Sequence, residues 1–276
     1  MSLPVQKTYK NFVGGVYVRP ESGRTKDFLG SRVPVSSRKD LRQAVEAANK
    51  ATVPASAYLR GQIVYRLAEM LSARKQEFID YLKMEGLSQQ VAEQEIELAI
   101  DRVVLMAGWA DKYSQILSSI NAVEGPYFVS TAPEPKGICV LAAPADPGLT
   151  ILLTRMLAAF VTGNPAVVLF ESSCLSRLAL AELIQASDFP QGTINLLCGQ
   201  LDELLPVAAA HKQIALLDLS LEISNLSEFQ EIATSNLKRL IIPTAEQLDP
   251  ASSQSASVSV LNDFCEQKTV WHPLGF

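Results

Sequence analysis

The pattern of apolar and polar residues changes its period after Gly125-Pro126. Before this point, apolar residues recur every three or four positions, a spacing that places them on one face of a helix. After it, short uninterrupted apolar runs alternate with helical stretches, a pattern typical of a parallel sheet that helices cover on both faces. We therefore expect a helical N-terminal segment followed by an α/β region.

Three helices are expected in the first part of the chain, after an extended hairpin within residues 1–35. Ser37 is expected to cap the first helix, because Asp40 lies three residues further on, as in a capping box. The second helix is expected to end near Gly86. The apolar stripes of the three helices are Leu41, Val45 and Ala48; Ile63, Leu67, Met70, Leu71, Phe78 and Leu82; and Ile96, Ile100, Val103 and Ala107. The acidic residues expected on the solvated face of the third helix are Glu93, Glu95 and Glu97.

The α/β region is expected to begin within residues 135–164, where an apolar strand turns directly into a helix. A run containing Ile138, Val140 and Leu141 is followed by a Pro/Gly turn and by an apolar helix over residues 149–161. The further strands are expected at residues 166–170, 193–198, 214–219 and 237–242, with helices around 178–185, 201–210 and 226–234. Because right-handed crossovers join such units, the sequence predicts a Rossmann-like open parallel sheet with helices on both faces.

Two segments lie outside this alternation. The extended segments "YFVSTAP" and "GICVLAAP" flank a Pro/Gly turn at residues 134–137, which predicts a hairpin near residues 126–140. Residues 243–260 are rich in serine, contain two prolines and show no period, so we expect a linker there. Residues 261–276 form a last apolar segment with Trp271 and Phe276, and an aromatic segment of this kind is usually held against another surface.

The composition is that of an ordinary folded protein, with 48% hydrophobic residues, 19% charged residues and a net charge of −5. A negative net charge gives no reason to expect a nucleic acid or an anionic membrane as a partner. No apolar window approaches the roughly 18 residues of a membrane span, and the first residues lack the apolar core of a signal peptide. We therefore expect a soluble, cytoplasmic protein. Its two histidines, His211 and His272, are too few and too far apart for a metal site, and none is expected.

The cysteines are expected to be buried, reduced thiols. The four residues, Cys139, Cys174, Cys198 and Cys265, show no close spacing, as is usual in a cytosolic protein without disulfides. Cys198 precedes Gly199 as in a nucleophile loop, but it ends an apolar strand and has no histidine near it in sequence. A buried thiol explains this position more simply than a nucleophile does.

Six segments resemble, in the same order, segments of the aldehyde dehydrogenase family. They are "SSRKDLRQAVEAANKA", "RLAEMLSARKQEF", "PKGICVLAAPADP", "GNPAVVLFESS", "FPQGTINLLCG" and "LKRLII". The resemblance covers nearly all of residues 9–242 and implies that residues 1–242 form the family's nucleotide-binding half. The ending "KTVWHPLG" resembles the C-terminal strand of the family's oligomerisation arm, to which the expected hairpin near 126–140 also belongs. The Ser-rich residues 243–260 stand where the family has its catalytic domain.

The resemblance implies that the family's catalytic residues are missing from this sequence. The family's cysteine nucleophile belongs to the segment that residues 243–260 replace. The family's oxyanion-binding Asn corresponds to Asp146, and a carboxylate would repel an oxyanion. The family's general-base Glu corresponds to Pro243. We therefore expect no aldehyde dehydrogenase mechanism and no catalytic residues. A rewired acid–base pair of Asp146 and Glu222 is a lesser alternative, because no nucleophile accompanies it.

The nucleotide-binding motifs also depart from the family's pattern. The family's Lys-Pro-Ser, which holds the adenosine ribose, corresponds to Phe170-Glu171-Ser172. Its Phe-Thr-Gly-Ser, where glycine lets the backbone approach the pyrophosphate, corresponds to residues 219–222, with Leu221 and Glu222 adding bulk and negative charge. The expected lining of this degenerate cleft is Asp146, Phe170, Ser172, Leu221 and Glu222. We expect no cofactor, and NAD is the nucleotide that the fold would favour.

The preferred hypothesis is a non-catalytic partner subunit of a full-length aldehyde dehydrogenase. An arm without a catalytic domain to receive it should seek another chain, because it exposes strand edges and apolar side chains. The expected interface residues are Tyr127, Phe128, Val129, Lys268, Thr269, Val270 and Trp271. A homo-oligomer formed through the same arm is an open alternative. The alternative from another class is a module that binds a nucleotide or another small molecule in the old NAD cleft.

Overall fold

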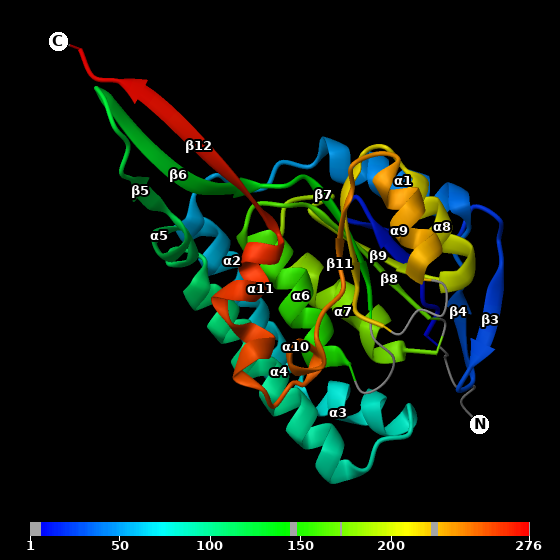
Figure 1. Ribbon diagram of the computed structural model, residues 1–276. Helices are drawn as coiled ribbons and strands as arrows, with labels where there is room; N and C mark the ends of the chain where they lie inside the picture. The colour runs from blue at the N-terminus through cyan, green and yellow to red at the C-terminus, as the bar shows by residue number, and fades with distance from the viewer. Residues whose placement is uncertain (1–6, 144–147, 172, 222–225, 276) are drawn as a thin grey trace, which may run out of the picture.

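The computed structural model describes residues 7–143, 148–171, 173–221 and 226–275. A body of α/β layers carries an arm of extended strands that projects away from it (Figure 1). The C-terminal end of the chain lies at the tip of this arm, far from the N-terminal end (Figure 1).

The body is built on a seven-stranded sheet with the order β11-β10-β7-β8-β9-β1-β2. Its strands are β11 (Arg239–Ile241), β10 (Ile214–Leu219), β7 (Ile138–Ala142), β8 (Ala166–Phe170), β9 (Ile194–Cys198), β1 (Asn11–Val13) and β2 (Val16–Val18). The first five strands in this order are mutually parallel, and β1 joins β9 in the antiparallel sense. The predicted α/β, Rossmann-like architecture is therefore confirmed, with an antiparallel extension at one edge.

Helices cover both faces of this sheet, which is why its central strands are apolar without interruption. On one face, α6 (Leu149–Val161) and α7 (Leu175–Ala186) pack on the sheet, and α2 (Ala57–Ala73), α3 (Lys75–Met84) and α4 (Gln89–Trp109) pack on these two helices and share their core. The other face packs against α1 (Arg38–Lys50), α8 (Leu201–Ala210) and α9 (Leu226–Thr234). Successive side chains of β7 serve the two cores in turn, because a strand alternates its faces: Cys139 and Leu141 lie in the first core, and Val140 lies in the second.

The N-terminal part follows the predicted helices with two differences. The capping box at the start of α1 is present, with the Ser37 amide donating to Asp40 Oδ2 at 2.7 Å. The predicted second helix is divided into α2 and α3 at Arg74. The single expected hairpin is two hairpins, since β1 and β2 pair with each other and β3 (Thr25–Phe28) pairs with β4 (Ser31–Pro34).

The arm is a three-stranded antiparallel sheet with the order β12-β6-β5. It joins β5 (Ser119–Asn121), β6 (Tyr127–Pro135) and β12 (Cys265–Pro273), and α5 (Tyr113–Leu117) leads into it. The hairpin expected near residues 126–140 is wrong, because β6 pairs with β5 and β12, whereas β7 lies between β8 and β10. Gly137, with φ of +123°, separates the two strands and lets β7 enter the buried sheet.

Residues 243–260, expected to be a linker, are folded onto the body. They contain α10 (Ala245–Leu248), the 3₁₀ helix η1 (Ser253–Ala256) and the start of α11 (Val258–Asp263). Thr244 caps α10 by accepting from Gln247 N, and Ser252 caps η1 by accepting from Gln254 N. Val260 and Leu261 are fully buried beside α6. The polar residues of this segment therefore include helix caps, whose side-chain oxygens accept backbone N–H groups.

Candidate functional site

The carboxyl ends of the parallel strands are where open α/β sheets bind their ligands. Two residues of the expected cleft are described here. Phe170 ends β8 but is fully buried in the core beneath α6 and α7, so its side chain does not line an open cleft as expected. Leu221, two residues after β10, is half-buried and packs at the edge of the other core. Asp146, Ser172 and Glu222 lie outside the described residues.

Carboxylates of the chain itself occupy three helix N-termini at this edge. The Thr150 amide at the start of α6 donates to Glu95 Oε1 at 2.8 Å, and the Ser176 amide of α7 donates to Glu85 Oε1 at 2.7 Å. The Leu201 amide of α8 donates to Glu171 Oε1 at 3.2 Å. Helix N-termini attract anions because their first amides lack helical partners. Hydrogen bonds to glutamates of the same chain therefore already satisfy one amide at each of these three helix N-termini.

Glu95 corrects the expectation that it lies on a solvated helix face with Glu93 and Glu97. Glu93 and Glu97 are exposed, but Glu95 is buried between α4 and α6. Its side-chain carboxyl accepts a hydrogen bond there from the amide of Thr150, whose hydroxyl also donates to the Glu95 carbonyl at 3.2 Å. The spacing of the apolar stripe alone could not reveal this role, because the partner is 55 residues away in the sequence.

A buried ionic cluster lies between α6, β10 and α11. Arg155 Nε donates to Asp218 Oδ2 at 2.6 Å, and Ser220 Oγ donates to Asp218 Oδ1 at 2.9 Å. Arg155 Nη1 lies 3.5 Å from Asp263 Oδ2, and its guanidinium lies 5.2 Å from the centre of the Phe264 ring. Burial raises the pKa of Asp263 above its usual range, against the opposing attraction of Arg155. The sequence signal was a single arginine inside an apolar helix, paired with a single aspartate inside an apolar strand.

The cysteines are all buried, as expected. Burial raises the pKa of the Cys265 thiol to about 12 and that of Cys139 still further. Both groups are therefore neutral thiols near pH 7 and poor nucleophiles. Cys198 at the end of β9 is likewise inside the core.

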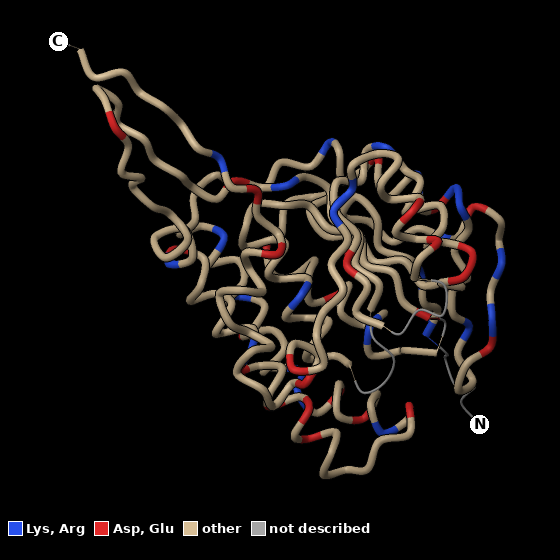
Figure 2. The backbone as a smooth tube through the Cα atoms, viewed as in Figure 1, with Lys and Arg blue, Asp and Glu red and all other residues tan. Residues whose placement is uncertain are grey.

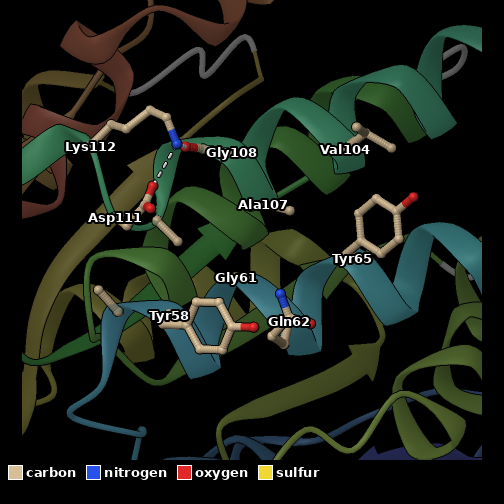
Figure 3. Close-up of a pocket in the computed structure, with 11 residues that line it drawn as sticks. Tyr58, Gly61, Gln62, Tyr65, Val104, Ala107, Gly108, Asp111 and Lys112 are labelled. Carbon is tan, nitrogen blue, oxygen red and sulfur yellow. Dashed lines mark hydrogen bonds and ion pairs between the residues drawn. The ribbon is translucent and has the colours of Figure 1, made fainter.

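The described residues also form a shallow groove of about 320 Å³ between α2 and α4 (Figure 3). Tyr58 and Tyr65 of α2 flank it, and the two helices approach closely because Gly61 has no Cβ, which would lie 3.1 Å from the Ala107 carbonyl oxygen. Lys112 Nζ is held by Asp111 Oδ1 at 2.6 Å and by the Gly108 carbonyl at 2.9 Å (Figure 3). The groove is thus mostly apolar, and its lysine is already engaged.

A second, polar groove of about 480 Å³ lies between β11, at the edge of the central sheet, and the base of β12. Arg239 crosses it, donating to the Asp263 carbonyl at 3.2 Å and approaching Glu266 Oε2 at 3.5 Å. Lys136 forms a further ion pair with Glu266, and hydrogen bonding by Lys136 lowers the pKa of that carboxyl.

The expected interface residues come together on the arm, with one exception. Figure 2 shows that charged residues are sparse on the outer part of the arm. The rings of Tyr127 and Trp271 meet edge to face at 5.7 Å, and Trp271 keeps 57% of its surface exposed. The exception is Val129, which is 2% exposed and is part of the arm's own packing. The other expected interface residues are exposed or half-exposed: Phe128, Lys268, Thr269 and Val270.

Lys268 and Thr269 also bind within the arm. Lys268 Nζ donates to Glu134 Oε1 at 2.9 Å, and the hydroxyls of Thr269 and Thr131 lie 2.8 Å apart. These bonds join β12 to β6 and keep the arm extended. Both side chains therefore already form hydrogen bonds within the arm.

Comparisons with known proteins agree with this architecture. A profile of the aldehyde dehydrogenase family matches residues 24–244. The putative aldehyde dehydrogenase DhaS of Bacillus subtilis is 31% identical over 213 residues, which are 71% of this chain and 42% of that protein. Cytosolic aldehyde dehydrogenase 1 of Elephantulus edwardii is 28% identical over 262 residues, 87% of this chain and 51% of that protein. The chain belongs to the aldehyde dehydrogenase family.

Solved structures give the same fold. The NAD⁺ complex of an aldehyde dehydrogenase from Bacillus cereus superposes with a TM-score of 0.78 at 23% sequence identity, covering 85% of this chain and 50% of that one. The chain spans at most about half the length of these relatives. The family match ends at residue 244, three residues after β11, and here residues 242–264 connect β11 directly to β12.

In the described residues, no cluster of three His, Cys, Asp or Glu side chains is arranged to hold a metal ion. Within the same residues, none of the helices combines the length and the apolar character needed to cross a bilayer.

Proposed function

We propose that this protein is a non-catalytic subunit that acts by binding a full-length aldehyde dehydrogenase through its arm. The observation that carries the proposal is the arm itself. Its strands β6 and β12 lie more than a hundred residues apart in the sequence and pair over nine positions, and Tyr127, Phe128 and Trp271 on them are exposed beyond the body. Exposed aromatic side chains on a sheet with an open edge are typical of an interface.

The residues at the family's catalytic positions support the same proposal. The stretch between β11 and β12 is short and folded, and it provides no room for a separate catalytic domain. By resemblance, Asp146 and Pro243 replace the oxyanion-binding Asn and the general-base Glu. The buried, neutral thiols of Cys139 and Cys265 offer no substitute nucleophile.

Co-purification from an extract of the native source tests this proposal. The tagged chain should retain a full-length aldehyde dehydrogenase at moderate salt, and Trp271→Ala should reduce the yield of that enzyme at least several-fold. Tyr58→Ala is the matched control, since it removes an exposed aromatic ring that belongs to α2 and not to a strand of the arm. Retention that is equal for wild type and Trp271→Ala, or no aldehyde dehydrogenase in the eluate, contradicts the proposal.

A second candidate function is nucleotide binding, favoured by the likeness to a structure described as an NAD⁺ complex. The carboxyl edge of the sheet is the place where such a ligand would bind. The internal capping of α6, α7 and α8 by glutamates opposes it, because these amides are no longer free for phosphate. A rise in melting temperature of several degrees with NAD or AMP would favour this candidate over the subunit role.

A further inference from the structure

Helix α6 connects the carboxyl edge of the central sheet to the root of the arm, which we define as residues 263–265. Its N-terminal end lies at that edge, where Glu95 caps it. Just beyond its C-terminal end, Asn164 Nδ2 donates to the Phe264 carbonyl at 2.9 Å, and Asn164 Oδ1 accepts from the Gly137 amide at 2.8 Å. Gly137 lies just after β6 and Phe264 just before β12, so both long strands of the arm are bound where they leave the body.

Arg155, in the middle of α6, lies between two carboxylates. Asp218 is the second-last residue of β10, at the carboxyl edge, and Asp263 ends α11 at the arm root. Arg155 Nε donates to Asp218 Oδ2 at 2.6 Å, whereas Arg155 Nη1 stays 3.5 Å from Asp263 Oδ2. A charge-assisted N–H···O bond is about 2.7–2.9 Å long, so only Asp218 is hydrogen-bonded to the guanidinium.

Hydrogen-bonding capacity is left unused between Arg155 and the arm root. In the described part of the chain, Arg155 Nη1 and Nη2 and Asp263 Oδ2 have no hydrogen-bond partner, although all three atoms are buried. Asp218 differs, because Ser220 Oγ also donates to its Oδ1 at 2.9 Å. Buried polar groups without partners are costly. A shift of less than about 1 Å would give Arg155 and Asp263 the bond that is absent here.

The two carboxylates compete for Arg155, because one cation balances only one buried negative charge. Burial raises the pKa of Asp263 and the charge of Asp218 adds to this rise, against the attraction of Arg155 and, less strongly, of Arg239. Asp263 is thus the weaker competitor while Asp218 holds the guanidinium. When Asp218 is displaced or neutralised, Arg155 and Asp263 become the balanced pair.

We propose that Arg155 is a two-position switch that connects the carboxyl end of β10 to the arm root. In this structure Arg155 is bonded to Asp218. When the end of β10 is displaced, Arg155 transfers to Asp263 and holds the arm root more firmly, so a ligand bound at the carboxyl edge would stiffen the arm. The inference adds a regulation to the arm, and its biological use rests on the proposed role of the arm in binding another chain.

Hydrogen–deuterium exchange of the purified chain tests the switch. Asp218→Asn removes the competing charge and keeps the shape of the side chain. Peptides covering residues 258–267 should then exchange about fivefold more slowly than in wild type, which is the effect of one net hydrogen bond. A cluster that only holds the structure together gives the opposite result, because the loss of Asp218 then loosens α11.

Three further variants identify Asp263 as the new partner of Arg155. Asp218→Asn combined with Asp263→Asn should lose the slowing and exchange at least as fast as wild type at residues 258–267. Asp263→Asn alone should stay within about twofold of wild type, because Asp263 Oδ2 forms no hydrogen bond in the starting state. Asp202→Asn is the matched control, since Asp202 is exposed on α8, on the other face of the sheet, and should leave these peptides unchanged.

Three results overturn the inference. They are unchanged or faster exchange of residues 258–267 in Asp218→Asn, equal slowing in the single and the double variant, and an Asp218→Asn chain that does not fold. Failure to fold counts against the switch because Asp263 would then not have taken the place of Asp218. No partner protein is present in this experiment, so its failure leaves the co-purification test to decide the proposed function separately.

Discussion

At the scale of single residues, the ion pair between Arg155 and Asp218 stands out because both side chains are buried in the core. Arg155 is fully buried and donates a hydrogen bond to the buried carboxylate of Asp218. A buried ion pair adds little net stability, but breaking it leaves one charge uncompensated in a medium of low dielectric constant. The cluster therefore fixes how α6, β10 and α11 lie together.

Removing one partner of this pair should be far worse than removing both. Arg155→Met should lower the free energy of unfolding by roughly 3–5 kcal/mol, because Asp218 stays buried without its cation. Arg155→Met combined with Asp218→Asn should cost less than the sum of the two single changes, by about 1–3 kcal/mol. Urea denaturation of the four proteins measures this coupling. Strict additivity would show that the two side chains do not depend on each other.

At the scale of elements, the sequence predicted the structure best where a residue pattern is compatible with only one kind of element. The strands β7 to β10 were predicted closely, because uninterrupted apolar runs between helices fit only a sheet covered on both faces. The prediction of a linker at residues 243–260 was wrong because serine occurs both in helix caps and in flexible chain. The strand β5 was missed because it has three residues and is mostly polar.

The candidate site was harder to predict than the fold. The caps that Glu85, Glu95 and Glu171 provide join residues 30 to 91 positions apart, and no local pattern reports such contacts. Phe170 was placed in the cleft by its position in a motif, whereas the pleat of β8 turns its side chain into the core. A motif position fixes the backbone's place but not the direction of the side chain.

The folded state of residues 243–264 predicts a clear response to mutation. Leu261→Ala should lower the free energy of unfolding by about 2–5 kcal/mol, because Leu261 is fully buried and its loss leaves a cavity. Ser259→Ala, two residues earlier and exposed, should change it by less than about 0.5 kcal/mol. Thermal unfolding of both variants makes the comparison. Equal, negligible effects would mean that α11 does not pack on the body.

At the scale of the whole molecule, the chain joins half of an aldehyde dehydrogenase to an arm. The body keeps the family's parallel sheet, and residues 242–264 connect that body directly to the arm's C-terminal strand. The arm extends from the body with a nine-residue strand on its open side. The proposed role as a subunit that binds another chain rests on this arrangement.

Native mass spectrometry of the complex eluted with the tagged chain tests this account most directly. We predict an assembly whose mass includes both this 30.0 kDa chain and a full-length aldehyde dehydrogenase subunit, with the mixed assembly reduced at least several-fold in Trp271→Ala. An eluate that contains this chain only in multiples of 30.0 kDa, with no aldehyde dehydrogenase subunit in any assembly, would contradict the central claim.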